Sequence, residues 1–110
     1  MKEYFVYIVT NSTKTTLYIG VTNDLKQRII EHYLNRGKSK SFAGRYRCYN
    51  LLYYETFENP AEAIDREKEL KKWRREKKID LIQSENPNWI FLNSELFDSW
   101  PINDEDFSSR

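Results

Sequence analysis

Two runs near the N-terminus decide the fold: Tyr4-Phe5-Val6-Tyr7-Ile8-Val9 and Leu17-Tyr18-Ile19-Gly20-Val21-Thr22. Both runs are rich in β-branched and aromatic residues, which favour strands. The polar residues 10–14 between them are typical of a turn. The pattern therefore predicts an antiparallel pair of strands joined by a short polar loop.

A helix is predicted directly after the second strand. Thr22 or Asn23 is the expected N-cap, with Asp24 in the first turn. Arg28 and His32, the only histidine of the chain, are four residues apart and therefore lie on one face of this helix. They flank the apolar stripe expected to pack on the sheet, which consists of Leu25, Ile29, Ile30 and Tyr33. Strand tyrosines, a guanidinium and an imidazole can thus converge as in an active site.

The rest of the chain predicts a third strand at 50–57, a helix at about 61–75 and a last helix at about 76–84. Pro60 is expected at the first helical position, with Asn59 as its cap. The predicted fold class is α/β (α+β), with a small three-stranded antiparallel sheet flanked by helices in the order β-β-α-β-α-α. Residues 1–92 are expected to form the domain, and residues 93–110 an acidic, weakly ordered tail anchored at Trp100-Pro101.

Length and composition limit the class of protein. The 110 residues suffice for one domain with a modest core. No segment approaches the length of a membrane span, and the N-terminus lacks the apolar run of a secretion signal. The single cysteine, Cys48, excludes an intrachain disulfide and a cysteine-based zinc cluster. We therefore expect a cytoplasmic protein that does not associate with membranes.

Positive charge is concentrated in two parts of the chain. Residues 1–94 contain 17 basic and 12 acidic residues, a balance of +5, although the net charge of the whole chain is +1. Residues 68–78 are rich in Lys and Arg. Residues 35–47 resemble a long basic loop that grips a phosphate backbone while an aromatic ring stacks on a base; a merely solvated loop is the alternative. Its basic candidates for nucleic-acid contact are Lys38, Lys40, Arg45 and Arg47.

Three features of the first two strands and the helix resemble the signature of the GIY-YIG nuclease superfamily. They are Val6-Tyr7-Ile8, in which Val replaces the glycine of the first tripeptide, Tyr18-Ile19-Gly20, and Arg28. The likeness covers roughly residues 4–92. It points to the small single-domain bacterial members, which are similar to the nuclease domain of the excision-repair incision enzyme. The resemblance implies a DNA endonuclease that uses one Mg²⁺ or Mn²⁺ ion.

Glu67 is the most informative carboxylate of the second long helix. Helical geometry places it within the apolar arc formed by Ala63, Ile64, Leu70 and Trp73. A charged group facing a core needs a partner, and geometry alone favours an ion pair with Arg28 or Arg74. The resemblance favours the other reading, in which Glu67 is the single protein ligand of the metal.

The resemblance also assigns roles in metal-assisted hydrolysis of a phosphodiester. Tyr7 acts as general base or orients the attacking water, and Arg28 stabilises the charge on the phosphoryl oxygens. A phenol needs a nearby cation to lower its pKa for such a role, and the metal, Arg28 or Lys26 could supply it. Tyr18 and His32 orient water or relay protons. Gly20, Lys26, Lys71 and Arg74 complete the expected contacts to DNA.

Each of these residues also has a purely structural explanation. Strand tyrosines usually pack, a lone helical histidine is usually a boundary residue, and Gly20 could serve a chain reversal or a close approach of phosphate. A non-catalytic nucleic-acid-binding module on the same scaffold is therefore the alternative function. A weaker third reading is a protein-interaction domain whose contact surface contains Trp73, Trp89 and Trp100. Asn86 is the nearest candidate for a late asparagine of the family's site.

Overall fold

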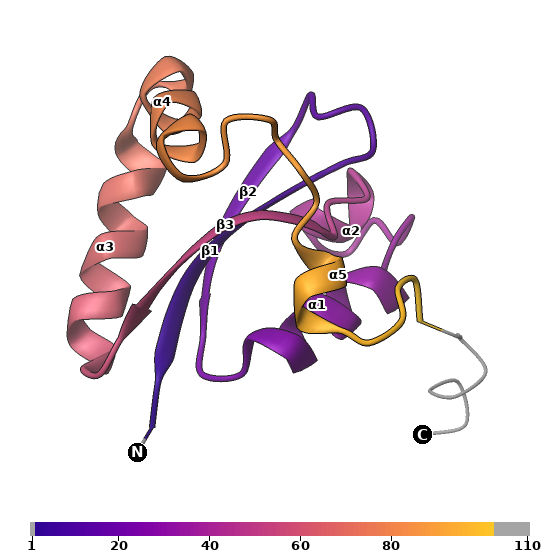
Figure 1. Ribbon diagram of the computed structural model, residues 1–110, viewed down its shortest axis with the longest axis horizontal. Coiled ribbons are helices and arrows are strands. Elements are labelled where there is room, and N and C mark those ends of the chain that lie inside the picture. The colour runs from indigo at the N-terminus through magenta and orange to yellow at the C-terminus, as the bar shows by residue number, and fades with distance from the viewer. Residues whose placement is uncertain (1, 103–110) are drawn as a thin grey trace.

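The computed structural model describes residues 2–102, which form a three-stranded antiparallel sheet with helices on both faces (Figure 1). The strands are β1 (Tyr4–Thr10), β2 (Leu17–Thr22) and β3 (Asn50–Phe57). Their order in the sheet is β2-β1-β3, so β1 is central and β2 is an edge strand. The predicted strands and α+β class are confirmed.

Three longer helices follow the predicted order: α1 (Leu25–Leu34), α3 (Pro60–Lys72) and α4 (Arg75–Glu85). Asn59 caps α3 with Pro60 at its start, as predicted. The predicted cap of α1 is wrong, because Asp24 occupies that position and its carboxylate accepts a hydrogen bond from the Gln27 amide at 3.1 Å. A carboxylate is a strong acceptor for the free amides of a first turn.

Side chains alternate between two cores because successive strand residues point to opposite faces of the sheet. Val6 and Ile8 lie in the core covered by α3 and α4, whereas Tyr7 and Val9 lie in the core covered by α1. Figure 1 shows α3 and α4 on one side of the sheet and α1, α2 and α5 on the other. Tyr7 therefore belongs to the α1 face.

The apolar arc predicted on the second long helix needs one correction. Ala63 and Leu70 are fully buried, but Ile64 is 42 % exposed. Trp73 lies at the C-cap of α3 and packs on the edge of the α3 core. The helix thus buries a narrower stripe than its sequence suggests.

The segment predicted to be a simple loop contains a short helix, α2 (Phe42–Arg45). Ser41 caps it by accepting a hydrogen bond from the Gly44 amide at 3.0 Å. Gly44 is buried where a Cβ atom would lie 2.7 Å from the Asn35 carbonyl oxygen, so a side chain has no room there. Residues 35–47 are therefore a folded unit.

Residues 93–102 differ from the expectation of a weakly ordered tail. They begin with α5 (Asn93–Leu96), and the buried Asn93 side chain accepts a hydrogen bond from the Leu51 amide at 2.8 Å. The Trp100 ring contacts Tyr33 at 5.1 Å between centroids. The domain boundary at residue 92 remains a prediction, and the acidic residues 103–110 lie outside the described part.

Within residues 2–102, no helix has both the length and the apolar character needed to cross a membrane.

Candidate active site

Tyr7, Tyr18 and His32 meet beneath α1, as the sequence predicted for two strand tyrosines and the only histidine. Tyr7 is fully buried, and its hydroxyl oxygen lies 2.7 Å from His32 Nε2. The His32 ring lies 5.6 Å from the Tyr7 ring and 5.5 Å from the Tyr18 ring. The phenol and the imidazole are thus already in hydrogen-bonding contact, which is the geometry required for proton transfer.

Gly20 has a structural role that the sequence did not indicate, and its contact with a phosphate stays a prediction. Gly20 lies inside β2, directly opposite Tyr7 in the register, and not at a chain reversal. A Cβ atom on Gly20 would overlap the Tyr7 hydroxyl and lie 2.5 Å from its Cζ atom. Tyr7 therefore extends across Gly20, and its hydroxyl lies over β2, the edge strand of the sheet.

Arg28 lies at the surface of the cluster. Its side chain is 41 % exposed, and its Nε atom lies 3.3 Å from Glu31 Oε1, an exposed pair of low energy. The guanidinium charge acts on both Tyr7 and His32, lowering the pKa of each. Arg28 is therefore close to the hydrogen-bonded pair and also accessible to an anion.

Glu67 projects from α3, which packs on the other face of the sheet from α1. Its side chain is only 16 % exposed and pairs with Lys71, with 3.5 Å between Oε2 and Nζ. Arg28 and Arg74, the partners considered from the sequence, do not form this pair. The negative charge of Glu67 nevertheless raises the pKa of Tyr7. α3 also contacts β2, the strand over which the Tyr7 hydroxyl lies.

The pKa of Tyr7 is raised overall, whereas the sequence analysis expected a nearby cation to lower it. Burial raises the pKa of Tyr7 far above its usual value, Tyr18 and Glu67 raise it further, and Arg28 opposes them only in part. Burial, helped by the charge of Arg28, lowers the pKa of His32 to about 4. Both hydrogen-bonded groups are therefore uncharged at neutral pH.

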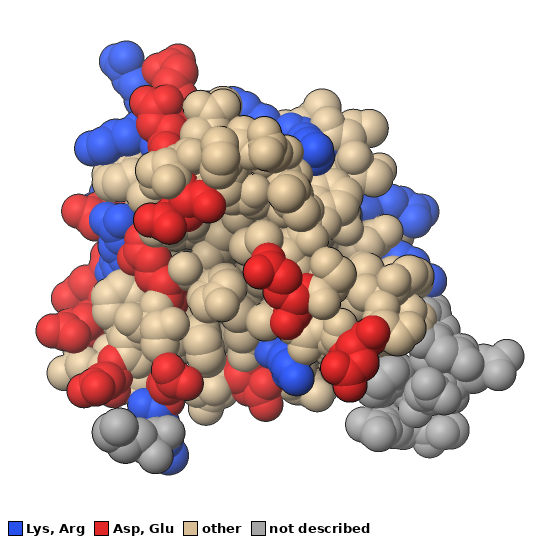
Figure 2. Space-filling view, in the orientation of Figure 1, with Lys and Arg blue, Asp and Glu red and all other residues tan. Residues whose placement is uncertain are grey.

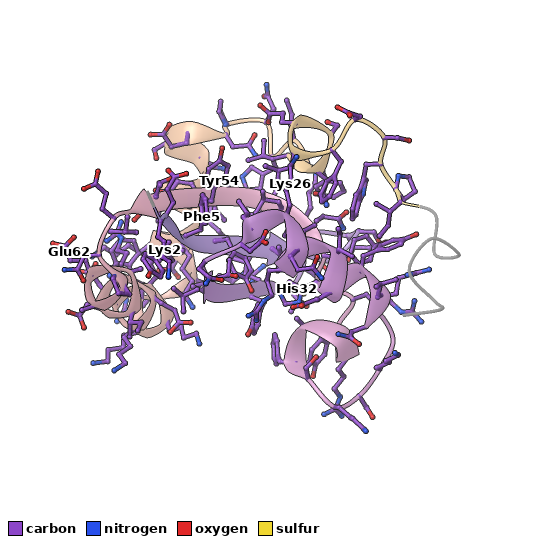
Figure 3. The ribbon with its side chains drawn as sticks, turned by 90° about the horizontal axis from the view of Figure 1, so that it is seen from below. Lys2, Phe5, Lys26, His32, Tyr54 and Glu62 are labelled. Atoms are coloured by element: carbon purple, nitrogen blue, oxygen red, sulfur yellow. The ribbon has the colours of Figure 1, made fainter. Side chains whose placement is uncertain are left out.

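The basic residues predicted to contact DNA come from different elements of the fold, and their contact with DNA stays a prediction. Lys26 lines a small pocket with Phe5 and Tyr54, and Figure 3 shows these three residues together, away from His32. Arg74 caps α4, and Lys71 is engaged by Glu67. The remaining four candidates, Lys38, Lys40, Arg45 and Arg47, are exposed on the segment that contains α2.

Asn86 has a structural role that the sequence did not reveal. It ends α4, is buried, and donates hydrogen bonds to the carbonyl oxygens of Leu52 at 3.0 Å and Ile90 at 2.8 Å. Its amide oxygen accepts from the Ile90 amide at 3.0 Å. These bonds occupy both ends of the side chain, so Asn86 fastens the 86–90 turn to β3.

The tryptophans do not form the single contact surface of the third reading. Trp73 and Trp89 pack against the core under α3 and α4, whereas Trp100 packs against the core under α1. The described part also contains a groove of about 840 Å³ along β3 and residues 85–96, which holds none of the predicted catalytic residues. Figure 2 shows acidic side chains across the middle of the face that carries α5, so this face suits a DNA backbone poorly.

The chain is similar to a known domain family, to bacterial proteins and to a solved structure. The family described as the GIY-YIG catalytic domain matches residues 3–80. The UPF0213 protein SERP0126 of Staphylococcus epidermidis is 37 % identical, and the UPF0213 protein SA0446 of Staphylococcus aureus is 39 % identical. Each match spans 76 % of this chain and 98 % of the relative. The solution NMR structure of the UPF0213 protein BH0048 of Bacillus halodurans is 28 % identical, with a TM-score of 0.50, covering 79 % of this chain and 89 % of that one.

Proposed function

The chain belongs to the GIY-YIG family, and this membership supports a nuclease role. We propose that the protein is a divalent-metal-dependent endonuclease. It hydrolyses phosphodiester bonds of DNA and responds to DNA structure or damage rather than to sequence. The observation that carries this proposal is the buried 2.7 Å hydrogen bond between Tyr7 and His32, next to the accessible guanidinium of Arg28. Structural packing alone gives little reason to join a phenol, an imidazole and a guanidinium in this way.

Tyr7 and His32 act as a proton relay in this proposal. The Tyr7 oxygen takes a proton from the attacking water while its own proton passes to Nε2 of His32, 2.7 Å away. Burial and Arg28 make this imidazole a weak base, and the negative charge of a bound phosphate would favour its protonated form. As the water oxygen bonds to phosphorus, the bond to the leaving sugar oxygen breaks and that oxygen takes a proton from solvent. A concerted transfer of this kind never requires a free tyrosinate, so the raised pKa of Tyr7 does not prevent it. Arg28 holds the phosphate oxygens through its planar fork, and Tyr18 supports the imidazole ring.

Glu67 is the residue we propose as the metal ligand. No group of three or more His, Cys, Asp or Glu side chains is arranged around a metal position within residues 2–102. A single partly buried carboxylate suits Mg²⁺ or Mn²⁺, because these hard cations retain several water ligands. Bound there, the ion would act as a Lewis acid toward the phosphate. The Lys71 ammonium would have to release Glu67, and it could then contact a DNA phosphate.

A non-catalytic nucleic-acid-binding module remains the second candidate. The Glu67–Lys71 ion pair favours it, because an internal cation already neutralises the only carboxylate proposed to hold the metal. In that case the exposed basic residues around α2 would bind DNA and the buried cluster would serve only stability. A small surface offers few contacts to base edges, so neither candidate is expected to read sequence.

The test is cleavage of labelled single-stranded, duplex, flap and four-way-junction DNA with Mg²⁺ or Mn²⁺. We expect the wild type to nick at least one substrate, and Glu67→Ala to reduce the rate at least 100-fold. Asp65→Ala is the matched control, because Asp65 lies on the same helix but is exposed. Binding without cleavage by all three proteins would refute the nuclease and support the module. Equal cleavage by Glu67→Ala would refute the proposed metal ligand.

A further inference from the structure

Two large aromatic side chains lie side by side on the surface of α2. Phe42 is 50 % exposed and Tyr46 is 44 % exposed, and their ring centroids are 4.7 Å apart. The Arg45 guanidinium lies 5.8 Å from the Tyr46 ring. Single exposed aromatic residues are common, but an adjacent pair that leaves this much apolar area in water suggests a binding surface.

The exposed pair is connected to the candidate active site through ring contacts. Phe42 stacks on Tyr18, with 6.1 Å between centroids and 24° between planes. Tyr18 in turn meets the His32 ring edge-on at 5.5 Å. Phe42 is therefore two ring contacts, and Tyr46 three, from the imidazole that bonds Tyr7.

Hydrogen bonds hold the pair in a fixed position. The Gly37 amide donates to the Gly44 carbonyl oxygen at 2.8 Å, and the Cys48 amide donates to the Ala43 carbonyl oxygen at 2.8 Å. With the Ser41 cap described above, these bonds anchor α2 on both sides. A fixed surface loses little entropy when a ligand binds, so the exposed rings are preorganised.

We propose that Phe42 and Tyr46 form a stacking platform for unpaired nucleobases next to the scissile phosphate. Every base presents a π face, and stacking on aromatic side chains is a common way to bind single strands without reading sequence. In a duplex each base is already stacked on its neighbours, so the platform selects DNA with an unpaired segment. Phosphates beside the stacked base would contact the exposed basic side chains of the same segment, Lys38, Lys40, Arg45 and Arg47.

This inference rests on the proposed function for the position of the scissile phosphate, but its test does not require cleavage. Binding is measured in EDTA with a single-stranded oligonucleotide that carries the fluorescent base 2-aminopurine, which stacking quenches. We expect wild-type protein to quench the fluorescence, and Phe42→Ala and Tyr46→Ala each to weaken binding about tenfold. Tyr46→Phe should bind like the wild type because it keeps the ring.

Three controls separate stacking from charge and from folding. Lys40→Ala should reduce the salt dependence of binding but leave the quenching of the bound complex unchanged. An oligonucleotide of the same length that is abasic at every position should bind wild type and Phe42→Ala equally. Because Phe42 also packs on Tyr18, urea unfolding must show that each variant is folded under the binding conditions, and Phe42→Trp should retain quenching.

The outcomes distinguish the two proposals. Unchanged binding and quenching in both folded alanine variants would overturn the platform, even if the protein cleaves DNA. An equal loss of affinity for fully paired duplex in these variants would also overturn it. Quenching that depends on Phe42 and Tyr46 in a protein that cuts nothing with Mg²⁺ or Mn²⁺ would uphold the platform and refute the nuclease.

Discussion

Replacing Gly20 with alanine should destabilise the protein by expelling the Tyr7 ring from its place. The new Cβ atom would overlap the Tyr7 hydroxyl and lie 2.5 Å from Cζ, far inside van der Waals contact. Tyr7 is fully buried and bonded to His32, so it cannot move without breaking that bond or disturbing its neighbours. The substitution thus tests whether Gly20 exists to accommodate Tyr7.

The expected magnitude comes from three opposing effects. Overpacking a core costs about 1–3 kcal/mol, and losing the hydrogen bond between Tyr7 and His32 costs about 1 kcal/mol. Against these, glycine to alanine in a conformation that alanine can adopt stabilises by about 0.5 kcal/mol, because the unfolded chain loses freedom. The net expectation is a loss of about 1.5–3.5 kcal/mol. Without the steric overlap, the sign would be reversed.

Urea unfolding measures this loss, and a second substitution identifies its cause. Gly20→Ala should remain costly in a Tyr7→Phe background, because Cζ stays in place, and should become neutral or stabilising in a Tyr7→Leu background. Comparing these two double-mutant cycles separates the energetic effect of the Tyr7 ring from that of its hydroxyl. If Gly20→Ala stabilises the wild type, or costs the same beside Leu as beside Tyr, the reasoning about this contact is wrong.

Two further predictions concern His32 and Asn93. The pKa of His32 falls from 6.5 to about 4 on folding, so the unfolded chain takes up a proton that the native protein refuses. When the pH falls from 7 to 4.5, the free energy of unfolding should therefore drop by about 2 kcal/mol more in the wild type than in His32→Gln. If urea unfolding at the two pH values shows the same drop in both proteins, this prediction is wrong. Asn93→Ala leaves the buried Leu51 amide without its acceptor and should cost about 2–3 kcal/mol, whereas a change below about 0.5 kcal/mol would show that residues 93–102 do not stabilise the domain.

The strands and long helices could be predicted because local signals specify them. Residues 4–10, 17–22 and 50–57 are β-branched and aromatic, and Pro60 with Asn59 marks the start of α3. The convergence of Tyr7, Tyr18 and His32 also followed from strand and helix periodicity. These features depend on residues that are near in sequence or on neighbouring elements.

The features that sequence could not predict depend on distant contacts. Asn93 and Asn86 resemble turn residues, and only the folded chain shows that they bond backbone groups of β3 and its flank, more than thirty residues away. The same holds for Glu67: its periodicity correctly indicated partial burial, but periodicity could not identify Lys71 as its partner. Helix α2 was missed because its four residues lack periodicity, although Ser41 before them is a common cap.

The register between β1 and β2 explains why the two halves of the family signature occur together. Tyr7 and Gly20 are opposite each other, so the first half supplies a large ring and the second half supplies the space across which it lies. The Tyr7 hydroxyl thus lies over β2, the edge strand, where it bonds His32 on the α1 face, and the charge of Glu67 on α3 raises its pKa. A side chain at residue 20 would displace the phenol and break its hydrogen bond to His32. Val6, which stands where the signature has its first glycine, packs in the core covered by α3 and α4 and not in the core that contains Tyr7.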